Sequence, residues 1–79
     1  MSEEKIEVDA YSGYKGEEIP RSLVLNNEKI LVTQILRMWI EDEFGYRKRR
    51  RYFEIKGSNG FRYKIYFDED IKEWFLFTR

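Results

Sequence analysis

The residues best suited to chemistry are five consecutive cations, Arg47 to Arg51, between Tyr46 and Tyr52. Lys and Arg side chains bind phosphates and aromatic rings stack on bases, so this composition is typical of a strand that contacts nucleic acid. The candidate nucleic-acid-binding residues are Tyr46, Arg47, Lys48, Arg49, Arg50 and Arg51. A basic run is a weakly specific signal, so nucleic-acid binding is the alternative function rather than the first one.

A second interpretation of the basic segment comes from the acidic residues just before it. Glu41–Glu43 precede Gly45, and the cations follow it. If the chain turns at Gly45, the acids face the cations across an antiparallel hairpin, where each opposed pair contributes about 0.2–1 kcal/mol. Strand alternation from Phe53 would also point Arg51 inward, which is costly over an apolar core. The sequence therefore predicts an acid-paired arm that extends past the core, with most of its charges exposed to solvent.

Residue types that serve catalysis or metal binding are scarce in this chain. There is no Cys and no His, so the commonest nucleophile, general base and zinc ligands are missing. Carboxylates cluster at 41–43 and 68–70, but the second cluster lacks the glycine and distal glutamate of a calcium loop. We predict no catalytic residue, no metal site and no cofactor, and hence a protein that is not an enzyme.

Length and composition limit the fold. A chain of 79 residues forms one small domain (1–79), and without disulfides or a metal its core must come from large side chains. Six Phe, six Tyr and two Trp supply them. A net charge of zero disfavours a general polyanion binder. An acidic N-terminus, no Cys and no apolar run of about 18 residues predict a cytoplasmic protein that does not cross a membrane.

The elements that position these residues are predicted to be strands, most clearly towards the C-terminus. Large apolar residues alternate with polar ones from Phe61 to Phe67, with the period of two that marks a half-buried strand. The preceding Gly57-Ser58-Asn59-Gly60 segment favours a hairpin turn. An acidic turn at 68–73 leads to a last strand at 74–78. Three antiparallel strands are therefore expected between about Tyr52 and Thr78.

The first half of the chain has shorter strand signals. Apolar residues alternate with acids from Ile6 to Ala10, and Leu23–Leu25 form a short strand that ends at the Asn26-Asn27 turn. The segment Lys29–Glu41 fits two structures. Its apolar residues would line one face of an amphipathic helix, whereas its β-branched residues favour a strand with a bulge near Thr33-Gln34.

Turn and core positions distributed over most of the chain form a recognisable set. They are the segment Tyr11 to Leu23 (YSGYKGEEIPRSL), Val32, Ile35, Leu36, Trp39, Tyr52, Phe53, Gly60, Tyr63, Asp68, Trp74 and Leu76. This set resembles a small uncharacterised bacterial domain found alone or at the C-terminal end of Y-family polymerase-like mutagenesis proteins. The resemblance implies an all-β unit with Lys29–Glu41 as a strand and an association with DNA repair, and it brings no catalytic residue.

The sequence thus predicts an all-β fold of about six antiparallel strands in a small barrel or strongly bent sheet. The alternative is an α+β fold with one helix at 29–41. The predicted core is Ile6, Val8, Leu23, Leu25, Val32, Ile35, Trp39, Phe53, Ile55, Phe61, Tyr63, Ile65, Phe67, Trp74 and Leu76. For function, we predict a non-catalytic interaction module that binds a protein partner through a strand edge or aromatic patch. Nucleic-acid binding through 47–51 is the alternative, and self-association is a further one.

Overall fold

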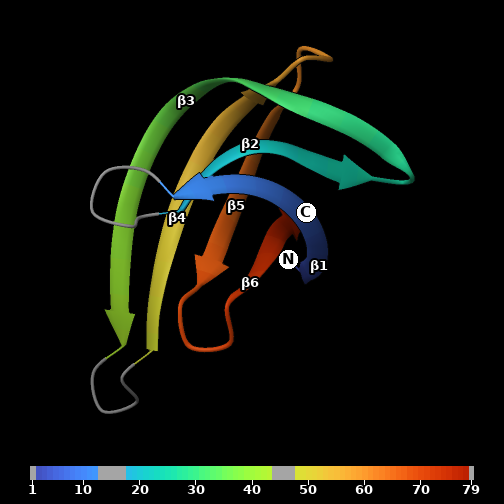
Figure 1. Cartoon of the computed structure of the whole chain (residues 1–79). Coiled ribbons are helices and arrows are strands. Elements are labelled where there is room, and N and C mark those ends of the chain that lie inside the picture. The colour runs from blue at the N-terminus through green and yellow to red at the C-terminus, as the bar shows by residue number, and fades with distance from the viewer. Residues whose placement is uncertain (1, 13–17, 44–47, 79) are drawn as a thin grey trace.

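The computed structural model describes residues 2–12, 18–43 and 48–78, which form six antiparallel strands closed into a barrel (Figure 1). The strands are β1 (Ser2–Ser12), β2 (Glu18–Leu25), β3 (Glu28–Glu43), β4 (Lys48–Gly57), β5 (Arg62–Asp68) and β6 (Glu73–Thr78). Each strand pairs with the next one, and β6 pairs with β1 to close the barrel. The predicted all-β class is confirmed, and 29–41 lies within a strand rather than a helix.

Two turns of the barrel lie where the sequence places residues that tolerate a left-handed backbone. Asn26 and Asn27 join β2 to β3 with φ of 51° and 64°, a conformation that asparagine adopts more readily than most residues. Gly60, with φ of 88°, lies in the turn between β4 and β5. Asp68 stabilises the last turn because its Oδ1 atom accepts the N–H of Asp70 at 2.9 Å.

Strand β3 changes its pairing partner along its length. Its first part, Glu28 to Leu31, pairs with β2, and its second part, from Val32 to Glu43, pairs with β4. The register shifts between Val32 and Gln34, as the sequence predicts, and again between Ile35 and Arg37. Such bulges bend a strand and increase its twist, so β3 curves across the top of the barrel and then descends beside β4 (Figure 1).

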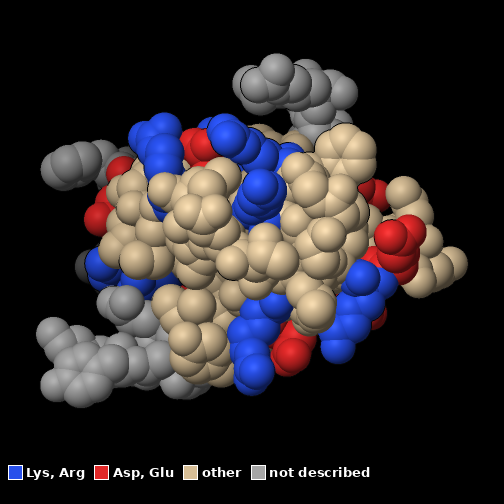
Figure 2. Space-filling view, turned by 90° about the horizontal axis from the view of Figure 1, so that it is seen from above, with Lys and Arg blue, Asp and Glu red and all other residues tan. Residues whose placement is uncertain are grey.

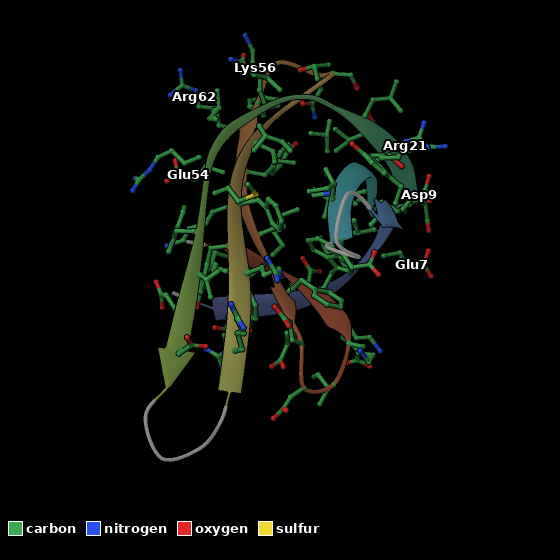
Figure 3. The ribbon with its side chains drawn as sticks, turned by 60° about the vertical axis from the view of Figure 1, so that its left-hand side comes forward. Glu7, Asp9, Arg21, Glu54, Lys56 and Arg62 are labelled. Carbon is green, nitrogen blue, oxygen red and sulfur yellow. The ribbon has the colours of Figure 1, made fainter. Side chains whose placement is uncertain are left out.

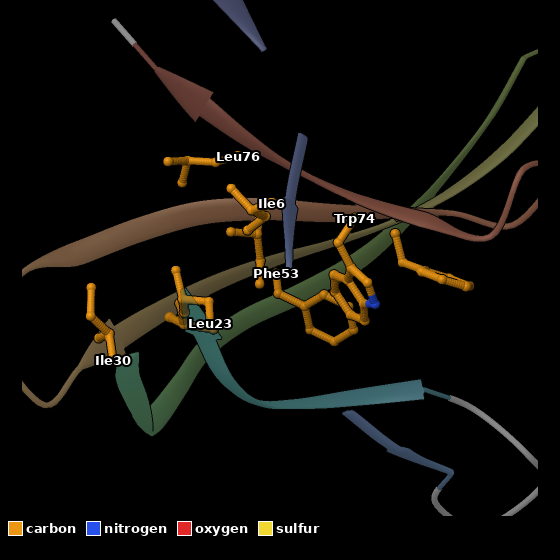
Figure 4. Packing of buried hydrophobic residues seen from close by; sticks show 9 residues of the cluster. Ile6, Leu23, Ile30, Phe53, Trp74 and Leu76 are labelled. Atoms are coloured by element: carbon orange, nitrogen blue, oxygen red, sulfur yellow. The ribbon is translucent and has the colours of Figure 1, made fainter. Parts of the chain in front are cut away.

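The core fills the inside of the barrel with side chains from every strand (Figure 4). Leu23, Phe53, Ile55 and Ile65 are its most enclosed apolar residues. The full set is Ile6, Leu23, Ile30, Phe53, Ile55, Ile65, Phe67, Trp74 and Leu76, with Val8, Ala10, Leu25, Val32 and Tyr63 packed against it. Most of the predicted core is therefore confirmed.

Two predicted core residues are exposed, a third, Trp39, lies on the outer face of the sheet beside Tyr52, and three buried hydrophobic residues were not predicted. Phe61 is exposed because it belongs to the turn: its carbonyl accepts the N–H of Gly57 at 2.8 Å, and β5 begins one residue later. Ile35 is exposed because it lies beside the second bulge of β3, beyond the end of the β2 pairing. The buried residues absent from the prediction are Ile30, Tyr52 and Tyr66.

Candidate functional site

The basic segment lies opposite the acidic one, as predicted. In the β3–β4 hairpin, Glu41 faces Arg50, Asp42 faces Arg49, and Glu43 faces Lys48 across the antiparallel register. Opposed charges of this kind fix the register of a hairpin more than they stabilise it. The predicted turn at Gly45, and the candidate residues Tyr46 and Arg47, lie outside the described residues.

The prediction that the charges of this arm are mostly exposed is wrong at Arg51. Only 15% of its side chain is exposed, against 50% for Arg49. Arg51 faces Phe67 of β5 in the register, and its Nε atom lies 2.6 Å from Glu69 Oε2. The cost of pointing an arginine inward is thus offset by a carboxylate from the turn after β5. At Arg50 and Arg51 the arm is therefore paired with β5 instead of extending beyond the barrel.

Arg50 is also largely enclosed, but on the outer face of the sheet. Its Nε atom lies 4.0 Å from Asp68 Oδ2, and its guanidinium group is 5.2 Å from the ring centroid of Tyr66. A hydrogen bond with Tyr52 is the largest effect that raises the pKa of Arg50, and burial partly opposes it. Together with the Arg49 pairs to Asp42 and Glu69, at 3.8 and 3.9 Å, these contacts occupy the described arginines of the arm with carboxylates and rings.

A row of aromatic side chains crosses the outer face of the barrel, opposite to the core. Trp39, Tyr52, Tyr66 and Phe75 are successive cross-strand partners on β3, β4, β5 and β6. Neighbouring ring centroids in this row lie 5.3, 5.2 and 5.1 Å apart, and the first pair is stacked at 7°. Rings packed in this way stabilise the sheet beyond the area that they bury.

The centre of this aromatic row is closed to ligands. Tyr52 is 4% exposed and Tyr66 is 2% exposed, so neither ring can stack on a nucleic-acid base. Burial is the largest effect that raises the pKa of Tyr66, and its hydrogen bond to Glu3 Oε2 at 2.8 Å adds to it. Lys64 lies over the rings of Trp39 and Tyr52, with its Nζ atom 5.4 and 5.5 Å from their centroids. Sequence reasoning missed this row, although adjacent aromatic residues such as Tyr52-Phe53 indicate a strand buried on both faces.

On the sides of the molecule that Figures 2 and 3 show, the described charges do not gather into one basic surface. Seen from above, Lys and Arg side chains are interspersed with Asp and Glu side chains and with uncharged residues (Figure 2). On the side of β4 and β5, Glu54, Lys56 and Arg62 project away from the barrel (Figure 3). Glu54 is paired with Arg37 at 3.2 Å. This mixture lacks the continuous basic patch that typifies a nucleic-acid interface.

The second part of β3 leaves one strand edge without a partner among the described strands. From Val32 to Glu43 it has register partners only on β4, and its descending part lies at the margin of the sheet (Figure 1). The β2–β3 pairing ends where β2 reaches Pro20 and Arg21, and a proline has no N–H to donate to a neighbouring strand. We call residues 36–43 of this strand the β3 edge.

Next to this divergence lies a pocket of about 270 Å³ between residues 19–21 of β2 and residues 32–35 of β3, with Tyr11 at its wall. Further along β3 from the pocket, Met38 is 56% exposed and Ile40 is 40% exposed. Both face the same side of the sheet as the core residue Phe53, because Met38 is its register partner. An exposed apolar pair on a strand that is paired along one edge only is a common feature of sites that bind an added strand.

Comparisons with known proteins return no match: no family model, no curated protein and no solved structure is similar to this chain. The resemblance to the small bacterial domain therefore stays a prediction. Among the described residues, no three or more acidic side chains are grouped so that they could hold a metal ion. The described part of the chain also contains no helix long and apolar enough to span a membrane.

Proposed function

We propose that this protein is a non-catalytic interaction module that binds an extended segment of a protein partner along the β3 edge. The observation that carries the proposal is that the β3 edge has register partners on β4 alone among the described strands. An unpaired edge presents a row of N–H and C=O groups, and an incoming strand satisfies them by extending the sheet. The backbone then supplies affinity, and alternate side chains supply specificity.

The chemistry of the partner follows from the side chains of the edge. On one face, Met38 and Ile40 are exposed and apolar, so the added strand should carry an apolar residue at every second position. On the other face, Trp39 lies between Arg37 and Glu41, and its ring is 4.9 Å from the Arg37 guanidinium group. This face suits an aromatic or charged residue in the partner.

A library of extended peptides displayed on phage tests this proposal without a known partner. Selected peptides should show apolar residues with a period of two, and Met38→Lys and Ile40→Lys should each abolish their binding because a charge would enter the new contact. Leu31→Lys is the matched control. Leu31 is 53% exposed, but it lies in the part of β3 that already pairs with β2. Equal loss of binding in all three variants, or no selected peptide, would contradict the proposal.

Nucleic-acid binding through the basic segment is the second candidate, and its support is the exposure of Arg49. Pairing of Arg49 to Arg51 with carboxylates weakens this candidate, since each pair must be broken before a phosphate can bind. Fluorescence anisotropy with single-stranded and duplex DNA at low salt tests it. Steeply salt-dependent binding that Arg49→Ser reduces would favour nucleic acid over the protein partner.

A further inference from the structure

We infer that the extended segment that binds the β3 edge is the same edge of a second copy of this chain, paired antiparallel about Trp39. This inference rests on the proposed function and names the partner. The two-fold axis passes through Trp39, so the residue numbers of two opposed residues add up to 78. Arg37 then faces Glu41, Met38 faces Ile40, and Trp39 faces itself. Because the axis passes through a residue, opposed side chains of the two copies lie on the same face of the joined sheet. The alternation of hydrogen-bonded and non-hydrogen-bonded pairs in an antiparallel ladder is then maintained.

Charge complementarity selects this register among its neighbours. The exposed cation Arg37 is the only described basic residue in the second part of β3, and it is four positions from Glu41. An axis through Trp39 therefore places Arg37 of each copy opposite Glu41 of the other, so the interface contains this charge pair twice. Moving the axis to Met38 would place Arg37 against Trp39 instead, and moving it to Ile40 would place Met38 against Asp42. Over residues 37–41, only the axis at Trp39 opposes apolar with apolar and positive with negative, and outside this range it places Leu36 opposite Asp42 and Ile35 opposite Glu43.

The aromatic row on the outer face also ends at this edge. Trp39 is half-buried and stacks on Tyr52, and no described ring lies on its other side in the register. In the paired edges, the two Trp39 rings come into cross-strand contact, so that two rows of four rings join into one. The side chains of Arg37 and Trp39 can rearrange for this pairing because their present contacts are exposed. Arg37 forms an ion pair with Glu54, and Trp39 Nε1 donates a hydrogen bond to Glu41 Oε2.

Charge exchange at two positions tests the inference. Sedimentation equilibrium of the native chain should show a mass that rises towards twice the monomer as concentration increases. Arg37→Glu or Glu41→Arg alone should weaken the dimer about tenfold or more, because like charges then face each other twice. Mixed in equal amounts, the two variants should associate again, because every opposed pair is then of opposite sign. Failure of the mixture to associate, while each variant keeps its native thermal stability, would overturn the register.

Cysteine pairs give a second test that does not depend on charge. The chain has no Cys, so Met38→Cys and Ile40→Cys introduce the only thiols, at exposed positions. Directly opposed strand residues lie within the range of about 4.4–6.8 Å between Cα atoms that a disulfide requires. Under mild oxidation, a mixture of the two variants should give a mixed disulfide dimer, and each alone should give little. Efficient bridging of Met38→Cys with itself would place the axis elsewhere and refute the inference.

The failure of this inference can be told from the failure of the proposed function. A chain that stays monomeric at every concentration, but whose selected peptides are lost in Met38→Lys, would refute the second copy as partner and leave the edge as the binding site. A chain whose dimer is unaffected by Arg37→Glu, Met38→Lys or Ile40→Lys would refute the inference, since the interface would then lie on another surface. If Met38→Lys and Ile40→Lys also left the binding of the selected peptides unchanged, the proposed function would be refuted as well.

Discussion

Replacing Gly57 with alanine is the sharpest test of how the barrel is packed. Gly57 is buried at the end of β4, where its N–H donates to the Phe61 carbonyl at 2.8 Å. A Cβ atom at this position would lie 2.7 Å from Ile30 Cγ2, 2.9 Å from Asn59 Oδ1 and 3.1 Å from Tyr63 Cε2. Real Cβ atoms keep ordinary van der Waals contacts at 3.4–4 Å, so the neighbours must move.

None of these neighbours can move without loss. Ile30 is buried in the core cluster, so its branched side chain has no solvent to move into. Asn59 Oδ1 accepts the N–H of Phe61 at 3.1 Å, so displacing it would weaken the hairpin turn. Overpacking of this kind costs about 1–3 kcal/mol. For a domain of this size, each kcal/mol lowers the melting temperature by about 4–8 °C, so Gly57→Ala should melt several degrees below the native chain.

Thermal unfolding followed by far-UV circular dichroism measures this effect. Lys56→Ala, one residue earlier and exposed, is the control and should change the melting temperature little. The cause can be isolated by a double-mutant cycle, because Ile30→Ala removes the Cγ2 atom that the new methyl would strike. Gly57→Ala should cost less in that background than in the native chain. An equal cost in both backgrounds would show that the contact with Ile30 is not the reason for glycine at this position.

Two further predictions concern the buried polar groups. Arg51→Ser leaves the half-buried Glu69 without its 2.6 Å partner and should lower the free energy of unfolding by about 1–3 kcal/mol in urea denaturation. The control Arg49→Ser should lower it by less than about 1 kcal/mol. Equal losses in the two variants would contradict the different burial of the two arginines. The pKa of Tyr66 is raised, chiefly by burial, so the neutral phenol is favoured in the folded state. Stability should then be intact below about pH 10 and fall as the pH rises above it. In urea titrations, Tyr66→Phe should reduce the fall of the free energy of unfolding with rising pH above about pH 10. The exposed control Tyr11→Phe should leave this fall unchanged. An unchanged fall in both variants would contradict the assignment to Tyr66.

Local sequence signals were sufficient for most strands and turns of this protein, although they left 29–41 open between a strand and a helix. Asn26-Asn27 and Gly60 occupy turns because they tolerate a positive φ at low cost. The alternation from Phe61 to Phe67 predicted a strand because successive side chains of a strand point to opposite faces. Charge reversal across the β3–β4 turn predicted that Glu41–Glu43 face the cations that follow, and the observed register places Glu41 opposite Arg50. Each of these signals depends on residues that are close in the chain.

The tertiary structure alone decided which faces are covered. A period of two separates the two faces of a strand, but it does not say whether the polar-looking face is also enclosed. Tyr52 and Tyr66 are buried on the outer face because rings from four strands meet there, and Arg51 turns inward because the turn after β5 brings Glu69 within reach. The β3 edge likewise exists because bulges bend β3 away from β2. These outcomes depend on contacts between residues far apart in the chain, and the adjacent aromatic residues Tyr52-Phe53 are a local sign of only one of them.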